Sequence, residues 1–388
     1  MSQPRQELNP YESYDHGRNS DVIAKQAALA EELLKQGKNL TSKELAFIGI
    51  TFNEQGNFDP ASECLKNALK KLEEEKLDPQ EKLYIRTAVQ CAQANIKREH
   101  KEIDQSIVEF TAAKNECDKI TDLSSRSRVA YDIQRNLGIA YLIKQNYPLA
   151  IEAFERGRTA ARDYEKLTDV RGRLPIMYDY CGLAKVRASE MMGPLEFTLH
   201  QGGMQGLEMA KEKLYQEGIC DLEMAGDLFA RDPLRKRSQD HSSWLFHMGL
   251  AYKIGKNYPA AIASIEAGLA LRKELISFDK EPMLYCSRVG DAHKQLQELY
   301  LKVDNQAKES EHAGEYDRLR QRLEVLQKAP AQRNTEEKIE VPPPPPVVPG
   351  TRARQVMFIV PPRTSIQGVP PQTPLNSPTR RLGGNGST

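Results

Sequence analysis

The amino-acid sequence predicts an all-α solenoid of stacked helix pairs, followed by a proline-rich tail. Apolar residues recur three and four positions apart through most of residues 21–328, which is the spacing of amphipathic helices. One pattern of small and aromatic residues appears three times in this region. Residues 329–388 hold 13 of the 23 prolines, and proline neither continues a helix nor donates a backbone hydrogen bond. The helical array is therefore expected to end near residue 328.

The repeated pattern is clearest between Asn136 and Ala161. It consists of Leu137, Gly138, Tyr141, Tyr147, Ala150 and Phe154. The small residues let two helices approach closely, and the aromatic side chains fill the space around that contact. The polar run 144–146 interrupts the apolar period and is predicted to be the turn. The copies comprise Leu45, Ile48, Gly49, Phe52, Gly56, Phe58, Ala61, Leu65 and Ala68, and then Leu245, Met248, Gly249, Tyr252, Tyr258, Ala261 and Ile265.

These three units resemble the tetratricopeptide repeat, a pair of antiparallel helices with the pattern L-G-x-x-Y followed by A-x-x-x-F. The resemblance implies a right-handed superhelix whose inner groove binds other polypeptides. One pair cannot bury its apolar face alone, so neighbouring pairs must stack. Gly49 and Gly138 are 89 positions apart with Ala94 midway, which indicates units of about 44 residues instead of the usual 34. We therefore expect each helix to be about one turn longer.

The first two units are expected to follow a short leading segment. Residues 1–20 have no apolar period and are expected to be disordered. Residues 21–38 predict a helix, capped by Asp21 and stopped by Gly37, that covers the first full unit as a half-repeat. Ala94 marks a hidden second unit. The second helix of that unit places Ser106, Phe110 and Ala113 at the matching offsets.

The fourth unit, marked by Gly182, contains an insertion. Gly182 and Gly249 are 67 positions apart, which is 23 more than one unit. Residues 193–206 include glycines and a proline that oppose a helix, so this segment is predicted to be a loop that proteases cleave readily. A lid over the groove mouth is a second hypothesis. The second helix is expected to restart at about Leu207 and to end at residues 232–233.

Two long amphipathic helices are predicted in residues 281–328, after a fifth unit that opens at Trp244. The simplest interpretation is a solvated pair that caps the array. A short coiled coil is the alternative.

The tail, residues 329–388, is expected to be disordered because its composition cannot build a core. Residues 341–349 predict an extended polyproline II segment that could bind a polyproline-reading module or act as a spacer. The apolar run Val356–Val360 is either chance composition or a docking motif. Thr373 and Ser377 precede prolines and are possible phosphorylation sites.

The remaining features argue against several classes of protein. With 55 basic and 54 acidic residues, the chain gives no electrostatic reason to expect binding to nucleic acid or a membrane. It shows no apolar run long enough for a membrane span and no secretory signal. The six cysteines and seven histidines show no metal-ligand spacing, and no catalytic motif appears. We therefore expect a cytoplasmic, non-enzymatic protein without metal or cofactor.

The family resemblance implies that the first helix of each unit lines the groove. The implied groove residues are Ala46, Ile50 and Asn53; Arg135, Ile139 and Leu142; Asp179, Leu183 and Val186; and Phe246, Leu250 and Lys253. In the hidden unit, Cys91, Asn95 and Arg98 fall at the same positions. Chaperone-binding members clamp a terminal carboxylate with Lys, Asn and Arg, but here Ile50, Ile139 and Leu183 replace the asparagine. The groove is thus predicted to be apolar with scattered charges, or else its apolar residues pack between helices.

Together these features predict a scaffold or adaptor that binds a peptide or helix in the groove, with the proline-rich tail as a second docking segment. The alternative is a regulatory sensor, in which the groove binds a signal peptide or a phosphorylated partner and controls the tail.

Overall fold

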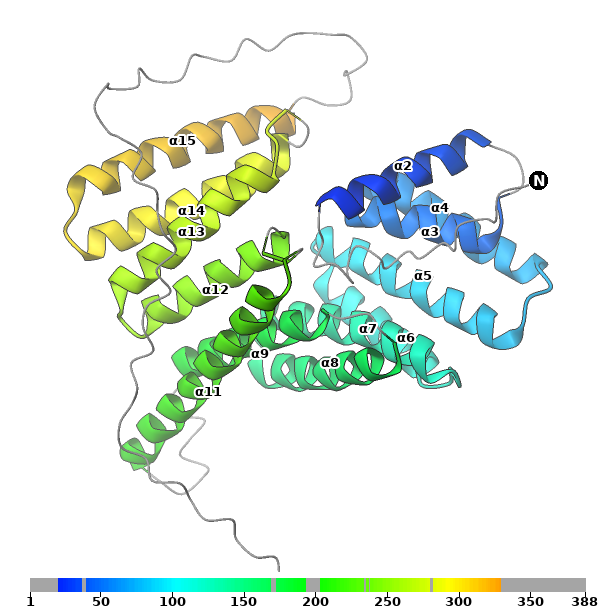
Figure 1. Cartoon of the computed structure of the whole chain (residues 1–388), viewed down its shortest axis with the longest axis horizontal. Coiled ribbons are helices and arrows are strands. Elements are labelled where there is room, and N and C mark those ends of the chain that lie inside the picture. The colour runs from blue at the N-terminus through cyan, green and yellow to red at the C-terminus, as the bar shows by residue number, and fades with distance from the viewer. Residues whose placement is uncertain are drawn as a thin grey trace, which may run out of the picture. The chain divides into compact units, whose positions relative to one another are not determined.

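The computed structural model describes residues 20–36, 40–168, 172–192, 203–233, 235–236, 238–279 and 282–328. Within these ranges all regular secondary structure is α-helical, and successive helices pack side by side in chain order (Figure 1). The expectations for residues 1–19, for the lid hypothesis at 193–202 and for the tail lie outside the described residues.

One leading helix and six helix pairs make up the described array. The bounds are α2 Ser20–Gln36; α3 Ser42–Glu54 and α4 Phe58–Glu74; α5 Pro79–Glu99 and α6 Ile103–Cys117; α7 Leu123–Ile143 and α8 Tyr147–Leu167; α9 Leu174–Met191 and α11 Gly203–Arg231; α12 Gln239–Ile254 and α13 Tyr258–Leu275; α14 Pro282–Lys302 and α15 Gln306–Lys328. The chain is thus an all-α helical-repeat solenoid. The hidden unit is the pair α5–α6, as predicted.

Helix length explains the long repeat. Helices α7 and α8 have 21 residues each, and the three-residue turn at 144–146 joins them. One such pair therefore spans 45 positions, which matches the period of about 44 read from the sequence. At 1.5 Å per residue, each of these helices is about 31 Å long.

Small residues sit where the two helices of a pair are closest. A Cβ atom added at Gly49 would lie 2.7 Å from Leu65, 16 positions later. At Gly138 it would overlap the ring of Phe154, again 16 positions later. Real Cβ atoms do not approach other atoms so closely, so a larger residue would push the helices apart. The close helix contact predicted at Gly138 is confirmed.

The turn between paired helices repeats with the same backbone geometry. In five of the six pairs, all but α9–α11, one residue of the turn has a left-handed φ: Gly56, Lys101, Gln145, Lys256 and Asp304. The N–H of the residue that follows donates to a carbonyl five positions earlier, at 2.8 to 3.0 Å, which closes the helix end. Because α14–α15 has this turn too, the predicted final pair is confirmed and is built like a repeat unit.

The fourth pair differs from the prediction at one point. Helix α11 begins at Gly203, four residues before the expected restart at Leu207, so Gly203 and Gly206 are helical. A glycine weakens a helix by only about 1 kcal/mol relative to alanine, and tertiary packing readily compensates for that loss. Here Gly182 of α9 meets Gly218 of α11, where an added Cβ would lie 2.7 Å from the Gly218 carbonyl oxygen. This close contact along α9 stabilises the longer helix.

Candidate functional site

A chain of polar side chains crosses the first helices of the first three units. We call Asn53, Asn95, Arg98, Asp132 and Asn136 the polar cluster. Asn95 Nδ2 donates to Asn53 Oδ1 at 3.0 Å, which links α5 to α3. Arg98 Nη1 donates to Asn136 Oδ1 at 2.8 Å, and Asn136 Nδ2 donates to the Asp132 carbonyl at 2.9 Å. The cluster therefore joins α3, α5 and α7 through side-chain hydrogen bonds.

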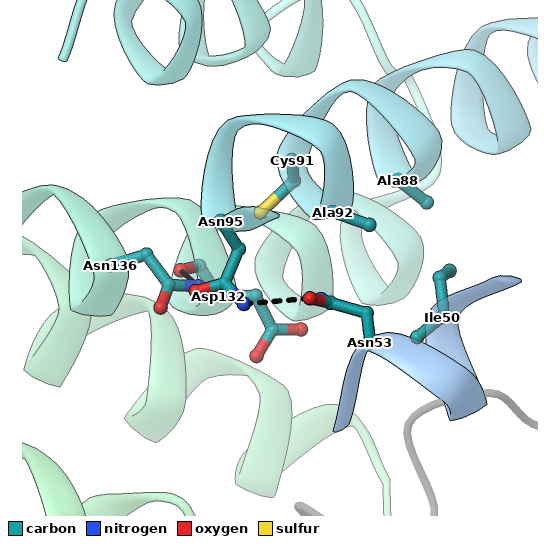
Figure 2. Close-up of a pocket in the computed structure, with 8 residues that line it drawn as sticks. All are labelled: Ile50, Asn53, Ala88, Cys91, Ala92, Asn95, Asp132 and Asn136. Carbon is teal, nitrogen blue, oxygen red and sulfur yellow. Dashed lines mark hydrogen bonds between the residues drawn. The ribbon is translucent and has the colours of Figure 1, made fainter. Parts of the chain in front are cut away.

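A cavity of about 20 Å³ opens onto the polar cluster (Figure 2). Its lining residues are Ile50, Asn53, Ala88, Cys91, Ala92, Asn95, Asp132 and Asn136. The cavity is large enough for one water-sized group. Among the described residues, the bond between Asn95 and Asn53 leaves the Asn53 amide N–H groups and the Asn95 side-chain carbonyl with hydrogen-bonding capacity. An amide pair of this kind can match the N–H and C=O of one peptide unit.

The Cys91 thiol in the cavity wall is not activated as a nucleophile or as a metal ligand. Burial raises the pKa of Cys91 far above its ordinary value, and nearby Asp132 raises it further. A thiol that stays protonated is a poor nucleophile and a poor metal ligand. The cavity is therefore suited to hydrogen bonding and not to covalent catalysis.

A second, larger depression lies between α7, α8 and α9, and we call it the α7–α9 pocket. It has a volume of about 440 Å³ and is lined by Leu142, Ile143, Gln145, Tyr147, Leu183, Arg187 and Met191. Ile143 and Met191 are 53% and 55% exposed, although both are large apolar residues. The volume is within the range of pockets that take a small ligand or peptide side chains.

A third group of polar residues lies where the third, fourth and fifth units meet. His247 Nδ1 lies 2.8 Å from Asp179 Oδ1, and burial raises the pKa of that carboxyl while His247 lowers it. The Tyr180 ring stacks on Phe154 at 5.4 Å and lies 5.5 Å from the His247 ring. Arg135 covers Tyr180 with its guanidinium carbon 5.9 Å from the ring centre. Because Asp179 holds Nδ1, Nε2 of His247 is the ring nitrogen left to face a ligand.

The structure separates the predicted groove residues into two sets. Asn53, Leu142 and Leu183 line the two concavities, as do Ile50 and Cys91 in the cavity wall. The others line neither concavity: Ala46, Arg135, Asp179, Val186 and Phe246 are buried, and Ile139, Leu250 and Lys253 are half-buried. Burial alone does not separate the two sets, because Ile50, Asn53 and Cys91 in the cavity wall are buried too. Lys253 is engaged at 2.6 Å with Glu298 of α14.

Sequence reasoning missed three residues that the fold brings to these sites. Asp132 and Asn136 lie six and two positions before Gly138 on α7, and His247 lies two positions before Gly249 on α12, as Asn136 does before Gly138. For His247 a usable signal was present, because it is a polar residue inside the apolar run 244–250. A buried polar side chain needs a partner, so such a position indicates either a network or a site.

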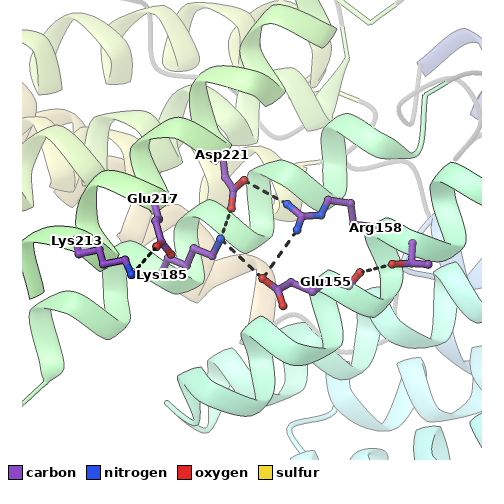
Figure 3. Close-up of polar contacts among 7 residues, drawn as sticks. Glu155, Arg158, Lys185, Lys213, Glu217 and Asp221 are labelled. Atoms are coloured by element: carbon purple, nitrogen blue, oxygen red, sulfur yellow. Dashed lines mark hydrogen bonds and ion pairs between the residues drawn. The ribbon is translucent and has the colours of Figure 1, made fainter. Parts of the chain in front are cut away.

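A separate network of charged residues, centred on the largely buried pair Lys185 and Asp221, belongs to the scaffold. Asp221 of α11 accepts from Lys185 of α9 at 2.7 Å and from Arg158 of α8 at 3.3 Å (Figure 3). Glu155 lies 3.9 Å from both cations. Each charge has an opposite partner within the network, so this group ties three helices together and leaves no charge for a ligand.

Within the described residues, no three His, Cys, Asp or Glu side chains are grouped so that they could hold a metal ion. None of the helices described is both long and apolar enough to span a bilayer.

Comparison with known proteins gives weak structural similarity only. No family model and no curated protein sequence matches this chain. BtubC from P. vanneervenii is 11% identical, with 85% of this chain and 99% of that chain covered and a TM-score of 0.31. The apo form of RapI is 12% identical, with 81% and 96% covered and a TM-score of 0.34. The human IFIT1 dimer with PPP-AAAA is 12% identical, with 81% and 64% covered and a TM-score of 0.36. Similarity at this level carries no argument about function.

Proposed function

We propose that this chain is a non-enzymatic scaffold of the tetratricopeptide type that binds an extended segment of another protein along the first helices of its units. The observation that carries the proposal is the Asn53–Asn95 pair, which borders a cavity and keeps one donor and one acceptor edge for a ligand. An extended peptide presents an N–H and a C=O at each residue that such a pair can satisfy. The apolar cavity walls strengthen these hydrogen bonds by excluding water.

The α7–α9 pocket supplies the second half of this interaction. An aliphatic or aromatic side chain of the partner would enter between Leu142 and Leu183, where Ile143 and Met191 are exposed. Full burial of one such side chain contributes about 1.5–3 kcal/mol. Hydrogen bonds at the polar cluster would then fix the register of the peptide, and the pocket would select its side chain.

The experiment that tests this function selects peptides from a random library on the full chain. The dissociation constant of a selected peptide is then measured by titration with wild type and variants. We expect Asn95→Ala to weaken binding about tenfold, because it removes hydrogen bonds worth about 1.5 kcal/mol. Leu183→Ser should weaken binding by a similar factor. Asn67→Ala on the exposed face of α4 is the matched control and should change nothing.

The proposal fails if the selection yields no binder, or if both inner-face variants bind the selected peptides as tightly as wild type does. Peptides that bind both variants as tightly as wild type would occupy another surface of the array. The chemical shifts of the α5 amides on titration would show which of these outcomes applies.

A regulatory sensor is the second candidate, and one observation favours it. Arg98 and His247 place a cationic and a protonatable group on the first helices, where a phosphorylated partner would need them. A phosphorylated version of a selected peptide should then bind more tightly than the unmodified one. Equal affinity would favour the simple scaffold.

The proposal extends to the proline-rich tail and to the cellular compartment of the protein. Residues 341–349 would dock a polyproline-reading module, and Thr373 and Ser377 would be modified by a proline-directed kinase. All six cysteines lie in described residues and are free thiols, which is consistent with a reducing cytoplasm.

A further inference from the structure

Two buried histidines face each other across the last helix pair. His293 of α14 is 4% exposed and His312 of α15 is 6% exposed. Their Nδ1 atoms are 2.8 Å apart, and the ring centres are 5.0 Å apart. Nineteen positions separate the two residues, so the sequence gives no sign of the pair.

The short distance between the two Nδ1 atoms determines which ring nitrogens carry a hydrogen. One Nδ1 must carry a hydrogen and donate it, and the other must accept with its lone pair. Both rings can therefore be neutral only in opposite tautomers. The two Nε2 atoms are buried, and neither has a hydrogen-bond partner among the described residues.

Adding protons to this pair is unfavourable at both steps. The first proton creates a buried cation whose Nε2–H has no acceptor, and a buried unpaired charge is costly. The second proton would place hydrogens on both Nδ1 atoms, so the bond between the rings would be lost. Two cations would then face each other at 5.0 Å.

The surrounding groups do not offset those costs. Lys273 and Glu266 face the pair from α13, and Lys308, Glu311 and Arg318 face it from α15. The two carboxylates are already engaged, because Glu311 accepts from Lys308 at 2.8 Å and Glu266 accepts from the Tyr300 hydroxyl at 2.7 Å. On α14 itself, Tyr300 stacks on His312 with the ring planes 7° apart.

We propose that His293 and His312 form a pH-sensitive latch, which holds α15 on the array while both rings are neutral and releases it when they become protonated. Release would break the apolar contact between Leu296 and Leu299 of α14 and Leu319 of α15. The end of the array would then present an apolar face that is covered at neutral pH.

The direction of the pH effect follows from burial. Desolvation lowers the pKa of His293 to about 4 and also lowers the pKa of His312, with Lys273 adding to the effect at His293. A histidine released to water titrates near 6.5. Between pH 6.5 and 4 the released state therefore binds more protons than the latched state. The latch is fully stable above pH 6.5 and weakens as the pH falls through this window.

Hydrogen–deuterium exchange of the full chain tests the latch. Protection factors of α15 amides, corrected for the intrinsic effect of pH, are compared at pH 7.4 and pH 5.0. For His293 alone, the pKa of about 4 predicts a protection loss of roughly 30-fold at pH 5.0. The amides of α4, a helix far from this pair along the chain, provide the internal reference for protection.

The matched variants separate the latch from general acid effects. His293→Leu together with His312→Phe removes both imidazoles while keeping an aromatic ring against Tyr300, so the protection of α15 should no longer depend on pH. His100→Gln, at an exposed histidine, should behave as wild type does. Unchanged wild-type protection at pH 5.0 overturns the proposal, and so does a loss that persists in the double variant. If the double variant does not fold at pH 7.4, the comparison of α15 with α4 in wild type alone decides.

Discussion

Gly138 shows how one residue sets the distance between two helices. An added Cβ would overlap the Phe154 ring, so Gly138→Leu should destabilise the chain by about 2–3 kcal/mol through overpacking. Gly314 of α15 is the matched control, because a Cβ there meets nothing within 4 Å. Gly314→Leu should instead stabilise its helix by about 0.5–1 kcal/mol. Thermal and urea unfolding of the two variants would measure both effects, and equal midpoints would contradict the proposed contact.

Gln145 is strained in a way that a substitution can relieve. Its φ of 57° lies in the left-handed region, which costs a residue with a Cβ about 1–2 kcal/mol. Glycine has no such cost, although it loses more backbone entropy on folding. We expect Gln145→Gly to stabilise the chain by up to about 1 kcal/mol, while Gln145→Ala leaves stability nearly unchanged. A rise in the unfolding midpoint with alanine as large as that with glycine would show that strain is not the cause.

At the residue scale the sequence predicted contacts better than conformations. The position of Gly138 followed from its spacing to Phe154, since both belong to one repeated pattern. The left-handed residues did not follow, because four of the five are Lys, Gln or Asp. Only the hydrogen bonds of the turn reveal that these positions are equivalent to Gly56.

The ion network is a property of three helices together, and Asp221 is its centre. Asp221→Asn would leave Lys185 and Arg158 near each other without their shared carboxylate, and Lys185 and Asp221 are only 10% and 12% exposed. We expect a loss of about 3 kcal/mol, since removing one partner leaves buried charge uncompensated. Glu217→Gln on the same helix breaks an exposed pair with Lys213 and should cost no more than about 0.5 kcal/mol. Urea unfolding compares the two, and a similar small loss in both would mean the network contributes little.

At the element scale the sequence predicted which segments are helical but not how some of them interact. Helical period and turn residues gave the pairs from α3–α4 to α14–α15. The start of α11 was misplaced because glycines were weighed without the packing of Gly182 on Gly218. The ion network joins residues 36 and 63 positions apart, and local periodicity contains no information on such pairs.

At the scale of the whole molecule, each helix contacts mainly its neighbours in sequence. Stability in such an array is the sum of local terms, so its ends should open more readily than its middle. We expect amides of α2 and α15 to exchange with solvent before those of α7 and α8 at pH 7.4. Hydrogen exchange of the native chain would measure this order. Uniform protection from α2 to α15 would instead indicate one cooperative unit.

The candidate site was only partly predictable at this scale. Asn53, Leu142 and Leu183 line the two concavities, and they were selected because the groove positions of tetratricopeptide repeats are fixed relative to the residues that correspond to Gly138. Ala46 and Phe246 occupy such positions too, but they line neither concavity. Long helices pack closely enough to bury these positions, and exposure depends on neighbours that the sequence does not identify.

The shared turn geometry also bears on how such a chain can change length over generations. Lys101 and Gln145 occupy the same place in two turns that are 44 positions apart. Unequal recombination between the two corresponding gene segments would add or remove α6 and α7 together, and it would interrupt no helix. The turns are therefore natural boundaries for duplication and loss. The number of units can change in this way while the rest of the array is preserved.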